Sequence, residues 1–381
     1  MSNSKLRGVI AAVATTAMIF SGAPSRAALE RLRAIGPGSV PRLAAWTRVL
    51  LEIAQAGSVE QLFAMRDLRE DPDPHVAMLA RQWTSQALEN TGDLEGALEA
   101  ARAAYDLCDD VDGPWQRAML SSQLASLAAQ LGDVPGARRH GEAALGPMEA
   151  LGAVEDATQL RAMLAICDMR EQRFDEAAAM LDRVATEDSS ESTFGSRMIV
   201  LCGQAELALA RGDVAVGLSL YRTTIAALSA RGPVPGIEVE IGLEPWVIWP
   251  LSGAVAAHAR LGRSAGAGLR DDLVDKAIRS LAGSPALFDF PVAGAVAFAL
   301  GLWELTADAP SEESVRTGVD LLGLADRFAY NRVLPSLDWA PAASVSERVR
   351  PGLLDQVLAG YAERPVDDLR AALAKLLDAL R

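Results

Sequence analysis

Four stretches of this chain repeat one pattern every forty residues: TGDLEGALEAARAA (91–104), LGDVPGARRHGEAA (131–144), EQRFDEAAAMLDRV (171–184) and RGDVAVGLSLYRTT (211–224). Each stretch places a small residue at the same position, and these residues are Ala97, Ala137, Ala177 and Gly217. Five residues earlier comes a turn position, which is occupied by Gly92, Gly132, Gln172 and Gly212. A repeat of this length is typical of stacked helical hairpins, because a single hairpin cannot bury its apolar face alone.

The repeat also fits the tetratricopeptide pattern, which places further small residues before and after each turn. Such residues stand seven before the turn at Ser85, Ala125, Ala165 and Ala205, and twelve after it at Ala104 and Ala144. Small side chains at these positions let two helices pack at close range. Steps of thirty-five residues back from Gly92 reach two more turn glycines, Gly57 and Gly22. We therefore predict an all-α fold, a tetratricopeptide-like right-handed α-solenoid of helical hairpins with turns near residues 22, 57, 92, 132, 172 and 212.

Aspartates follow three of the turn glycines, at Asp93, Asp133 and Asp213, and are expected to cap the next helix. The forty-residue register ends near residue 230, where ARGPVPGIEVE (230–240) is typical of a loop. Repeats are thus predicted over 1–230, and a C-terminal helical region that completes and caps the solenoid over 231–381. Helices are predicted there over 246–261, 269–281, 292–306, 311–328, 344–361 and 365–380. The last carries an apolar stripe, expected to lie on the preceding helices as a cap.

Charge and hydropathy narrow the classes of partner. The net charge of −14 disfavours direct binding to nucleic acid or to an anionic membrane. Residues 1–50 carry seven basic residues and one acid, a surplus of six positive charges. We interpret this end as a solvated face, with a basic docking end as the alternative. The apolar run from Gly8 to Phe20 is too short to span a bilayer.

Residues 1–27 allow two interpretations. Lys5 and Arg7 precede the apolar run, and Ser25-Arg26-Ala27 resembles a cleavage site, which together make the pattern of a secretory signal. The repeat register instead places a first helical hairpin here, with its turn at Gly22. Three cysteines, Cys108, Cys167 and Cys202, cannot all pair within the chain. This odd number favours a reducing compartment, so we predict a first hairpin and a cytoplasmic location.

The search for chemistry finds no strong motif. No Gly-Lys dipeptide occurs, which excludes a Walker A loop, and neither HExxH nor CxxC is present. The glycine cluster over 262–268 has no predicted strand before it and is interpreted as a helix-connecting loop. His75, His140 and His258 lie far apart in the sequence. We therefore predict no catalytic residues, no metal and no cofactor, so the chain is not expected to be an enzyme. Side chains that converge across repeats are the one remaining route to an active site.

Six of the seven tryptophans fall into two groups. Trp46, Trp83 and Trp115 fall within predicted helices of the repeats and are expected in the core. Trp246, Trp249 and Trp339 stand near prolines in the C-terminal region. Aromatic side chains in such places line a ligand pocket or anchor a partner, and core packing is the other interpretation.

Three C-terminal stretches are more specific than the repeats: GLEPWVIWPLSGAVAAHARLG (242–262), FDFPVAGAVAFALGLW (288–303) and LLGLADRFAYNRVLPSLDWAP (321–341). They resemble the C-terminal tetratricopeptide-like sensor region of actinobacterial antibiotic-regulatory (SARP/BTAD-type) transcriptional regulators. The resemblance implies a regulatory, interaction-based role. No winged-helix or nucleotide-binding segment is recognisable in these 381 residues, so DNA binding and ATP hydrolysis are not carried over. Residues in these stretches that we select as a candidate contact surface are Glu244, Trp246, Tyr330, Arg332 and Trp339.

Two functions follow from this sequence. In the first, the concave face of the solenoid binds a peptide or protein partner, such as a regulator that supplies DNA binding. In the second, the chain is a small-molecule sensor whose pocket lies near the C-terminal helices, beside Trp246 and Trp339. We prefer the first, a non-catalytic scaffold in transcriptional regulation or signalling.

Overall fold

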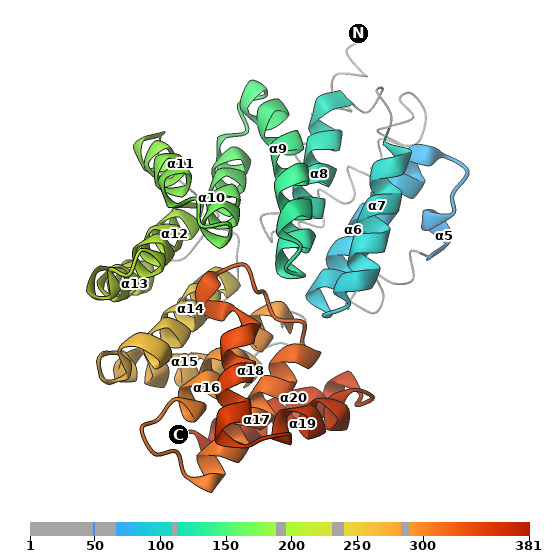
Figure 1. Cartoon of the computed structure of the whole chain (residues 1–381). Helices are drawn as coiled ribbons and strands as arrows, with labels where there is room; N and C mark the ends of the chain where they lie inside the picture. The colour runs from blue at the N-terminus through green and yellow to red at the C-terminus, as the bar shows by residue number, and fades with distance from the viewer. Residues whose placement is uncertain (1–48, 50–65, 109–112, 188–195, 231–239, 283–289) are drawn as a thin grey trace. The chain divides into compact units, whose positions relative to one another are not determined.

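The computed structural model is all-helical over the residues that it describes, which are residue 49 and 66–108, 113–187, 196–230, 240–282 and 290–381 (Figure 1). No strand occurs in these ranges, so the predicted all-α class is confirmed. The predicted turns near residues 22 and 57, the first hairpin, Trp46 and most of the 230–240 loop lie outside the described residues.

The chain divides into two compact units, each described here by itself. The described helices of the first unit are α5 (Arg66–Arg69), α6 (Pro74–Asn90), α7 (Leu94–Leu107) and α8 (Gly113–Gln130) as far as Leu124. From Ala125 on, the second unit contains α9 (Val134–Ala150), α10 (Val154–Arg170), α11 (Phe174–Glu187), α12 (Ser196–Ala210), α13 (Val214–Ser229), α14 (Pro245–Leu261), α15 (Arg263–Ala282), α16 (Phe290–Leu305), α17 (Glu312–Arg327), the 3-10 turn η3 (Pro335–Leu337), α18 (Trp339–Val349), α19 (Leu353–Tyr361) and α20 (Val366–Ala379).

Each turn position of the forty-residue repeat has a left-handed backbone. The φ angles are 81° at Gly92, 80° at Gly132, 60° at Gln172 and 89° at Gly212. The N–H of the next residue donates to the carbonyl five residues before it, as from Arg173 to Asp168 at 2.8 Å. This bond closes the helix end and reverses the chain, and glycine adopts the required φ without strain.

The aspartates after the turns cap their helices at two of three sites. Asp93 accepts from the Gly96 N–H at 2.9 Å, and Asp133 accepts from the Gly136 N–H at 3.0 Å. A Cβ on Gly136 would lie 2.1 Å from the Asp133 Oδ2 atom, so the glycine makes room for the carboxylate. The prediction was wrong for Asp213, which makes no such bond. The third residue after it is Val216, whereas the two capped helices have glycine at this position.

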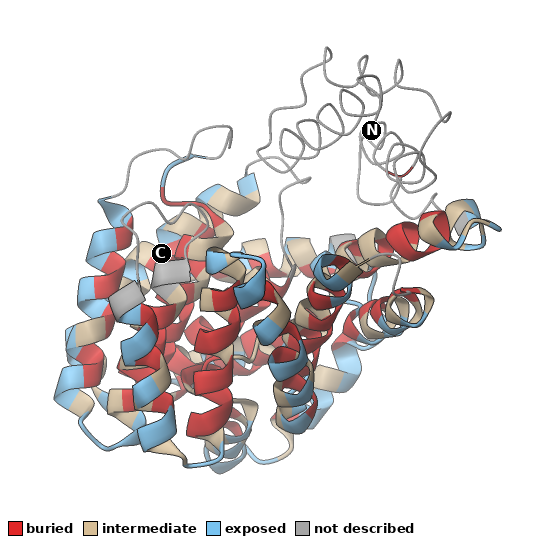
Figure 2. Ribbon diagram, turned by 90° about the horizontal axis from the view of Figure 1, so that it is seen from above, coloured by how far each residue is buried: buried red, intermediate tan, exposed pale blue. Residues whose placement is uncertain are grey.

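The small residues of the repeat are buried where its helices pack together. Ala137, Ala177 and Gly217 are buried, as are the residues seven before the turns, Ala165 and Ala205. Consecutive helices from α9 to α13 contact one another, and α10 also contacts α12. In Figure 2 the buried residues lie along the sides of the helices that face their neighbours. A single apolar cluster continues from Ala162 to Leu377, and it joins the repeat helices to the C-terminal helices.

The C-terminal helices differ most from their predicted bounds at two places. The predicted helix over 344–361 is two helices, α18 and α19, because Pro351 lacks an N–H and Gly352 has a φ of 72°. The glycine cluster was predicted as a loop, but α15 begins at Arg263 and includes most of it. In α20, Leu369, Leu373 and Leu377 are buried, and the helix packs on α15 and α17.

One predicted core tryptophan lies at the surface. Trp115 in the first turn of α8 is 42% exposed, whereas Gln116, Ala118 and Leu120 of that helix are buried. The indole thus lies on the solvent side of α8. The composition of the helix alone does not show which of its residues face solvent. Trp83 is half-buried and packs against the apolar cluster of its unit. The three cysteines are buried and unbridged.

Candidate interaction site

The site centres on an irregular segment between α17 and α18. Helix α17 ends where Ala329 adopts a φ of 49°, and the Tyr330 N–H donates to the Ala325 carbonyl. The chain then runs to Trp339, interrupted by the 3-10 turn at Pro335. We call residues 331–338 the docked segment, because side chains from distant helices hold it.

An aromatic cluster surrounds the start of this segment. The Tyr330 ring stacks on Phe298 of α16 with 4.7 Å between ring centroids, and Trp339 lies 6.2 Å from Tyr330. The guanidinium of Arg332 lies 4.8 Å from the centre of the Tyr330 ring and 5.4 Å from that of Trp339. Arg332 also pairs with Asp326 at 3.0 Å. Each cation–π contact contributes about 0.5–1 kcal/mol at a partly exposed site. The side chain of Arg332 therefore covers the aromatic cluster, and it is itself only half-buried.

Helix α10 holds the segment through its last residue. The Arg170 guanidinium donates to the Arg332 carbonyl at 2.6 Å and to the Val333 carbonyl at 3.4 Å. Both acceptors are backbone atoms, and the bonded residues are 162 and 163 positions apart in the sequence. A charged donor makes such bonds stronger than neutral ones.

Helix α12 holds the segment through a buried carboxyl group. Glu206 Oε1 accepts from the Ser336 N–H at 3.1 Å and from the Tyr221 hydroxyl of α13 at 2.5 Å. Burial raises the pKa of Glu206, while the hydrogen bonds from Tyr221 and Ser336 and the charge of Arg260 act to lower it. Burial likewise raises the pKa of Tyr221. Glu206 is therefore a hydrogen-bond acceptor whose charged form is disfavoured.

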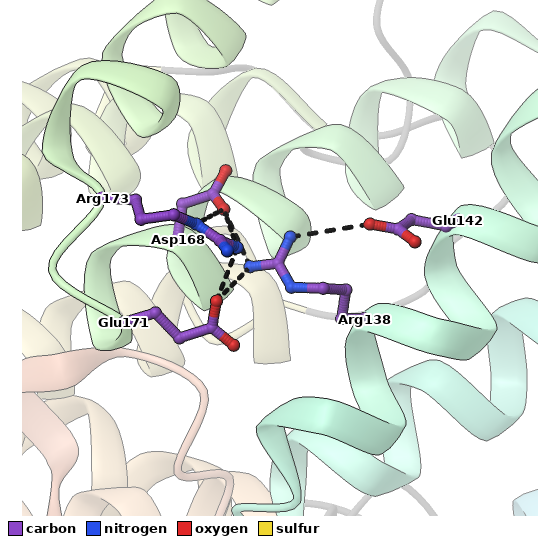
Figure 3. Close-up of polar contacts among 5 residues, drawn as sticks. All are labelled: Arg138, Glu142, Asp168, Glu171 and Arg173. Carbon is purple, nitrogen blue, oxygen red and sulfur yellow. Dashed lines mark hydrogen bonds and ion pairs between the residues drawn. The ribbon is translucent and has the colours of Figure 1, made fainter.

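A second polar cluster joins α9 to the turn between α10 and α11. Asp168 is buried and accepts from Arg138 at 2.8 Å and from Arg173 at 2.6 Å, as Figure 3 shows. Glu171 pairs with the same two arginines, and the exposed Glu142 lies 3.7 Å from Arg138. The two arginines balance Asp168 and Glu171 in charge. This arrangement serves to fix one hairpin against the next.

The structure brings together three of the five candidate contact residues. Tyr330, Arg332 and Trp339 form the aromatic cluster, with Tyr330 fully buried and its hydroxyl bonded to the Leu337 carbonyl. Glu244 and Trp246 lie at the start of α14, where buried Glu244 accepts from the Gly242 N–H at 2.6 Å. Trp246 packs, half-buried, against the apolar core. Among the described residues, neither makes a hydrogen bond, ion pair or ring contact with the aromatic cluster.

Sequence reasoning missed Arg170 and Glu206. A signal existed for Glu206, because it is the only acid in the apolar helix SRMIVLCGQAELALA. An acid in such a helix is buried only with a partner, so it marks a polar contact. Nothing local distinguishes Arg170 from the other arginines of the repeats, since its acceptors lie more than 160 residues away.

Two hollows formed by the described residues differ in character. An apolar cavity of about 30 Å³ lies between α14, α15, α16 and α20, beside Leu243 and Leu377, and has room for about one water molecule. A surface pocket of about 320 Å³ lies where the ends of α17, α18 and α19 meet, beside Arg316 and Arg350. In the part of the chain that the structure describes, no group of three His, Cys, Asp or Glu side chains is arranged to hold a metal ion.

The spacing G-x-S-x-G, which esterases use for a nucleophilic serine, occurs at Gly262, Ser264 and Gly266. The esterase motif requires a strand before the serine, whereas α14 precedes it here. Ser264 is exposed in the first turn of α15. The neighbouring His258 is buried, with Nδ1 on the Ala254 carbonyl and Nε2 near Arg222, and burial lowers its pKa. This geometry does not place a base on the serine.

No protein-family model and no curated protein matches this chain. Within the described ranges, no helix combines the length and the apolar character that crossing a bilayer requires. The fold and the site define only a class of protein. It is an all-α protein of helical hairpins, and its repeat helices hold an irregular segment of the same chain.

Proposed function

We propose that this chain is a non-catalytic protein-interaction module. In this proposal the hairpins form a right-handed tetratricopeptide-like α-solenoid, closed by the C-terminal helices, that binds a peptide or protein segment on its concave face. One observation supports it above the others: side chains of two repeat helices, Arg170 of α10 and Glu206 of α12, bond to the backbone of an irregular segment. Hydrogen bonds to backbone atoms are one means by which a scaffold holds a peptide.

We further propose that the module acts in transcriptional regulation or signalling in the cytoplasm. The resemblance of the three C-terminal stretches to the sensor region of antibiotic-regulatory proteins supports this role. The partner would then be a protein such as a DNA-binding regulator, because the net charge of −14 disfavours direct contact with nucleic acid.

A site-specific crosslinking experiment tests the interaction role. A photo-crosslinking amino acid replaces Gln159, which precedes Arg170 by eleven residues, about three helical turns, and so lies on the same face of α10. The matched control carries it at Val216, which is exposed on α13. Each full-length variant is irradiated in host lysate, and the adducts are identified by mass spectrometry.

The proposal expects one protein to be crosslinked from position 159 and not from position 216. Equal adducts at both positions would indicate collision rather than binding. If neither position gives an adduct with a protein, the interaction role is wrong. Circular dichroism of both variants checks that the helical fold is kept.

A further inference from the structure

Side chains from two repeat helices reach the docked segment at its backbone. Arg170 donates to two successive carbonyls, of Arg332 and Val333, and Glu206 accepts from the Ser336 N–H. Bonds from a side chain to the backbone do not depend on the side chains of the segment that is bound. The same two residues would therefore hold another segment that follows the same course.

Two leucines supply the specific part of the contact. Leu334 and Leu337 are fully buried, and Pro335 between them starts the 3-10 turn in which the Leu337 N–H donates to the Leu334 carbonyl. Leu334 packs against Gly253 of α14, where a Cβ would lie only 2.8 Å from the Leu334 Cδ1 atom. The missing side chain of Gly253 thus makes the space that this leucine fills.

Other residues of the segment remain partly accessible. Asn331, Arg332, Val333 and Pro335 are half-buried. The segment is fixed at its two ends, by the stacked Tyr330 ring and by helix α18, which begins at Trp339. Between these ends it is a short loop laid against side chains of three helices.

We infer that Arg170, Glu206 and Gly253, which we call the docking face, form a peptide-binding surface that the chain keeps occupied with its own residues 331–338. The partner that fits this face is a segment with the pattern Leu-Pro-x-Leu that forms the same 3-10 turn, and it competes with the docked segment. This inference rests on the proposed function, since it names the ligand chemistry of the same interaction module.

The docked segment belongs to the same chain as the docking face, and this covalent link explains how such a surface is regulated. A segment linked to its own binding site has an effective concentration of about 1 mM, so a free peptide of the same sequence competes poorly. Loosening the docked segment raises the fraction of chains with an open face, and the apparent affinity for the free peptide rises in proportion. The docked segment is in this sense an autoinhibitory contact.

A peptide-binding experiment on the full-length chain tests this inference. The substitution Ser336→Pro removes the N–H that Glu206 accepts and leaves every residue of the docking face unchanged. A fluorescein-labelled peptide with the sequence of residues 330–339 is titrated with each protein, and fluorescence anisotropy is measured. We expect the peptide to bind the Ser336→Pro variant at least about tenfold more tightly than the wild type.

A second variant and two controls keep the outcome clear. Leu334→Ala loosens the segment at its other anchor and should also increase binding, provided that circular dichroism shows a folded chain. Adding Arg170→Ala to Ser336→Pro should abolish the gain, and so should replacing both leucines of the peptide by aspartate. If both loosened variants fold but bind the peptide no better than the wild type, the inference is wrong. A protein still crosslinked from position 159 in that case would leave the interaction role standing.

Discussion

The carboxyl group of Glu206 on α12 lies 2.5 Å from the hydroxyl oxygen of Tyr221 on α13, and both side chains are buried. This contact joins the two helices of one hairpin, and the same carboxyl oxygen accepts from Ser336 of the docked segment. The groups that act on this carboxyl come from four elements: Cys202 on its own helix, Tyr221 of α13, Arg260 of α14 and Ser336 of η3. Burial is the largest influence and raises its pKa.

We therefore predict that the raised pKa of Glu206 makes the free energy of unfolding fall as the pH rises. Because the pKa of this acid is raised in the folded state above the ordinary value of 4.5, its protonated form is favoured by folding. That contribution is complete below the unfolded pKa and is lost as the pH rises through the folded pKa, with a slope of up to about 1.4 kcal/mol per pH unit. Urea unfolding at a series of pH values from 5 to 9 measures it.

The variant Glu206→Gln is the matched control for this prediction. A glutamine keeps an acceptor oxygen for Tyr221 and Ser336 but does not ionise, so its unfolding free energy should vary less with pH. Identical pH profiles for the wild type and Glu206→Gln would contradict the raised pKa.

Close packing around Gly217 predicts that even a substitution by alanine lowers the stability of the fold. A Cβ there would lie 2.5 Å from the Leu209 Cδ2 atom and 2.9 Å from the Ala205 carbonyl oxygen. Gly217→Ala should lower the free energy of unfolding by about 1–3 kcal/mol, because the backbone of α12 cannot move aside freely. Gly268→Ala is the control, since that helical glycine has open space around it and should gain up to about 1 kcal/mol. A stabilised Gly217→Ala variant in thermal denaturation would show that the α12–α13 contact is looser than described.

The left-handed turn at Gln172 predicts a stabilising substitution. Its φ of 60° is strained for a residue with a side chain, and the equivalent positions carry glycine. Gln172→Gly should raise the unfolding free energy by about 0.5–1 kcal/mol. The reverse change in an equivalent turn, Gly132→Ala, should lower it by about 1 kcal/mol through φ strain alone, because no atom lies near the added Cβ. Denaturant midpoints that shift in the same direction for both variants would argue against this explanation.

We predict that removing the buried carboxylate of Asp168 destabilises the fold more than removing the exposed carboxylate of Glu142 does. Asp168→Ala leaves Arg138 and Arg173 with Glu171 as their remaining close partner, and it should cost about 2–3 kcal/mol, reduced from the value for a fully buried pair because both arginines are partly exposed. Glu142→Ala removes only an exposed contact at 3.7 Å and should change stability by less than about 0.5 kcal/mol. Chemical denaturation of the two variants measures the difference. Equal losses would mean that Asp168 is no more important than a surface acid.

The helical class was predictable because its determinants are local. Turn glycines, the small residues at fixed offsets from them, and the leucine stripe of α20 all act within a few turns of helix. Two of the wrong local predictions each depend on one or two particular residues. Asp213 lacks its cap because Val216 stands where Gly96 and Gly136 stand elsewhere, and helix 344–361 is broken because Pro351 and Gly352 fall within it.

The candidate site was only partly predictable because its contacts are not local. Tyr330, Arg332 and Trp339 lie within ten residues of one another, so one stretch of sequence pointed to all three. Arg170 and Glu206 reach the same segment from more than 120 residues away, and no spacing rule connects residues at that distance. The burial of Glu206 and the opening at Gly253 became visible only once the helices were packed together.

The separation of 162 residues between Arg170 and its carbonyl acceptor has a consequence for synthesis of the chain. At ribosomal rates of about 5–20 residues per second, about 8–30 s pass between the appearance of α10 and that of the segment it holds. The early hairpins can stack on one another during this interval, and Glu206 can bond to Tyr221, but Arg170 and Glu206 have no docked segment to hold. A nascent chain halted before residue 330 therefore exposes a docking face that the finished protein keeps covered.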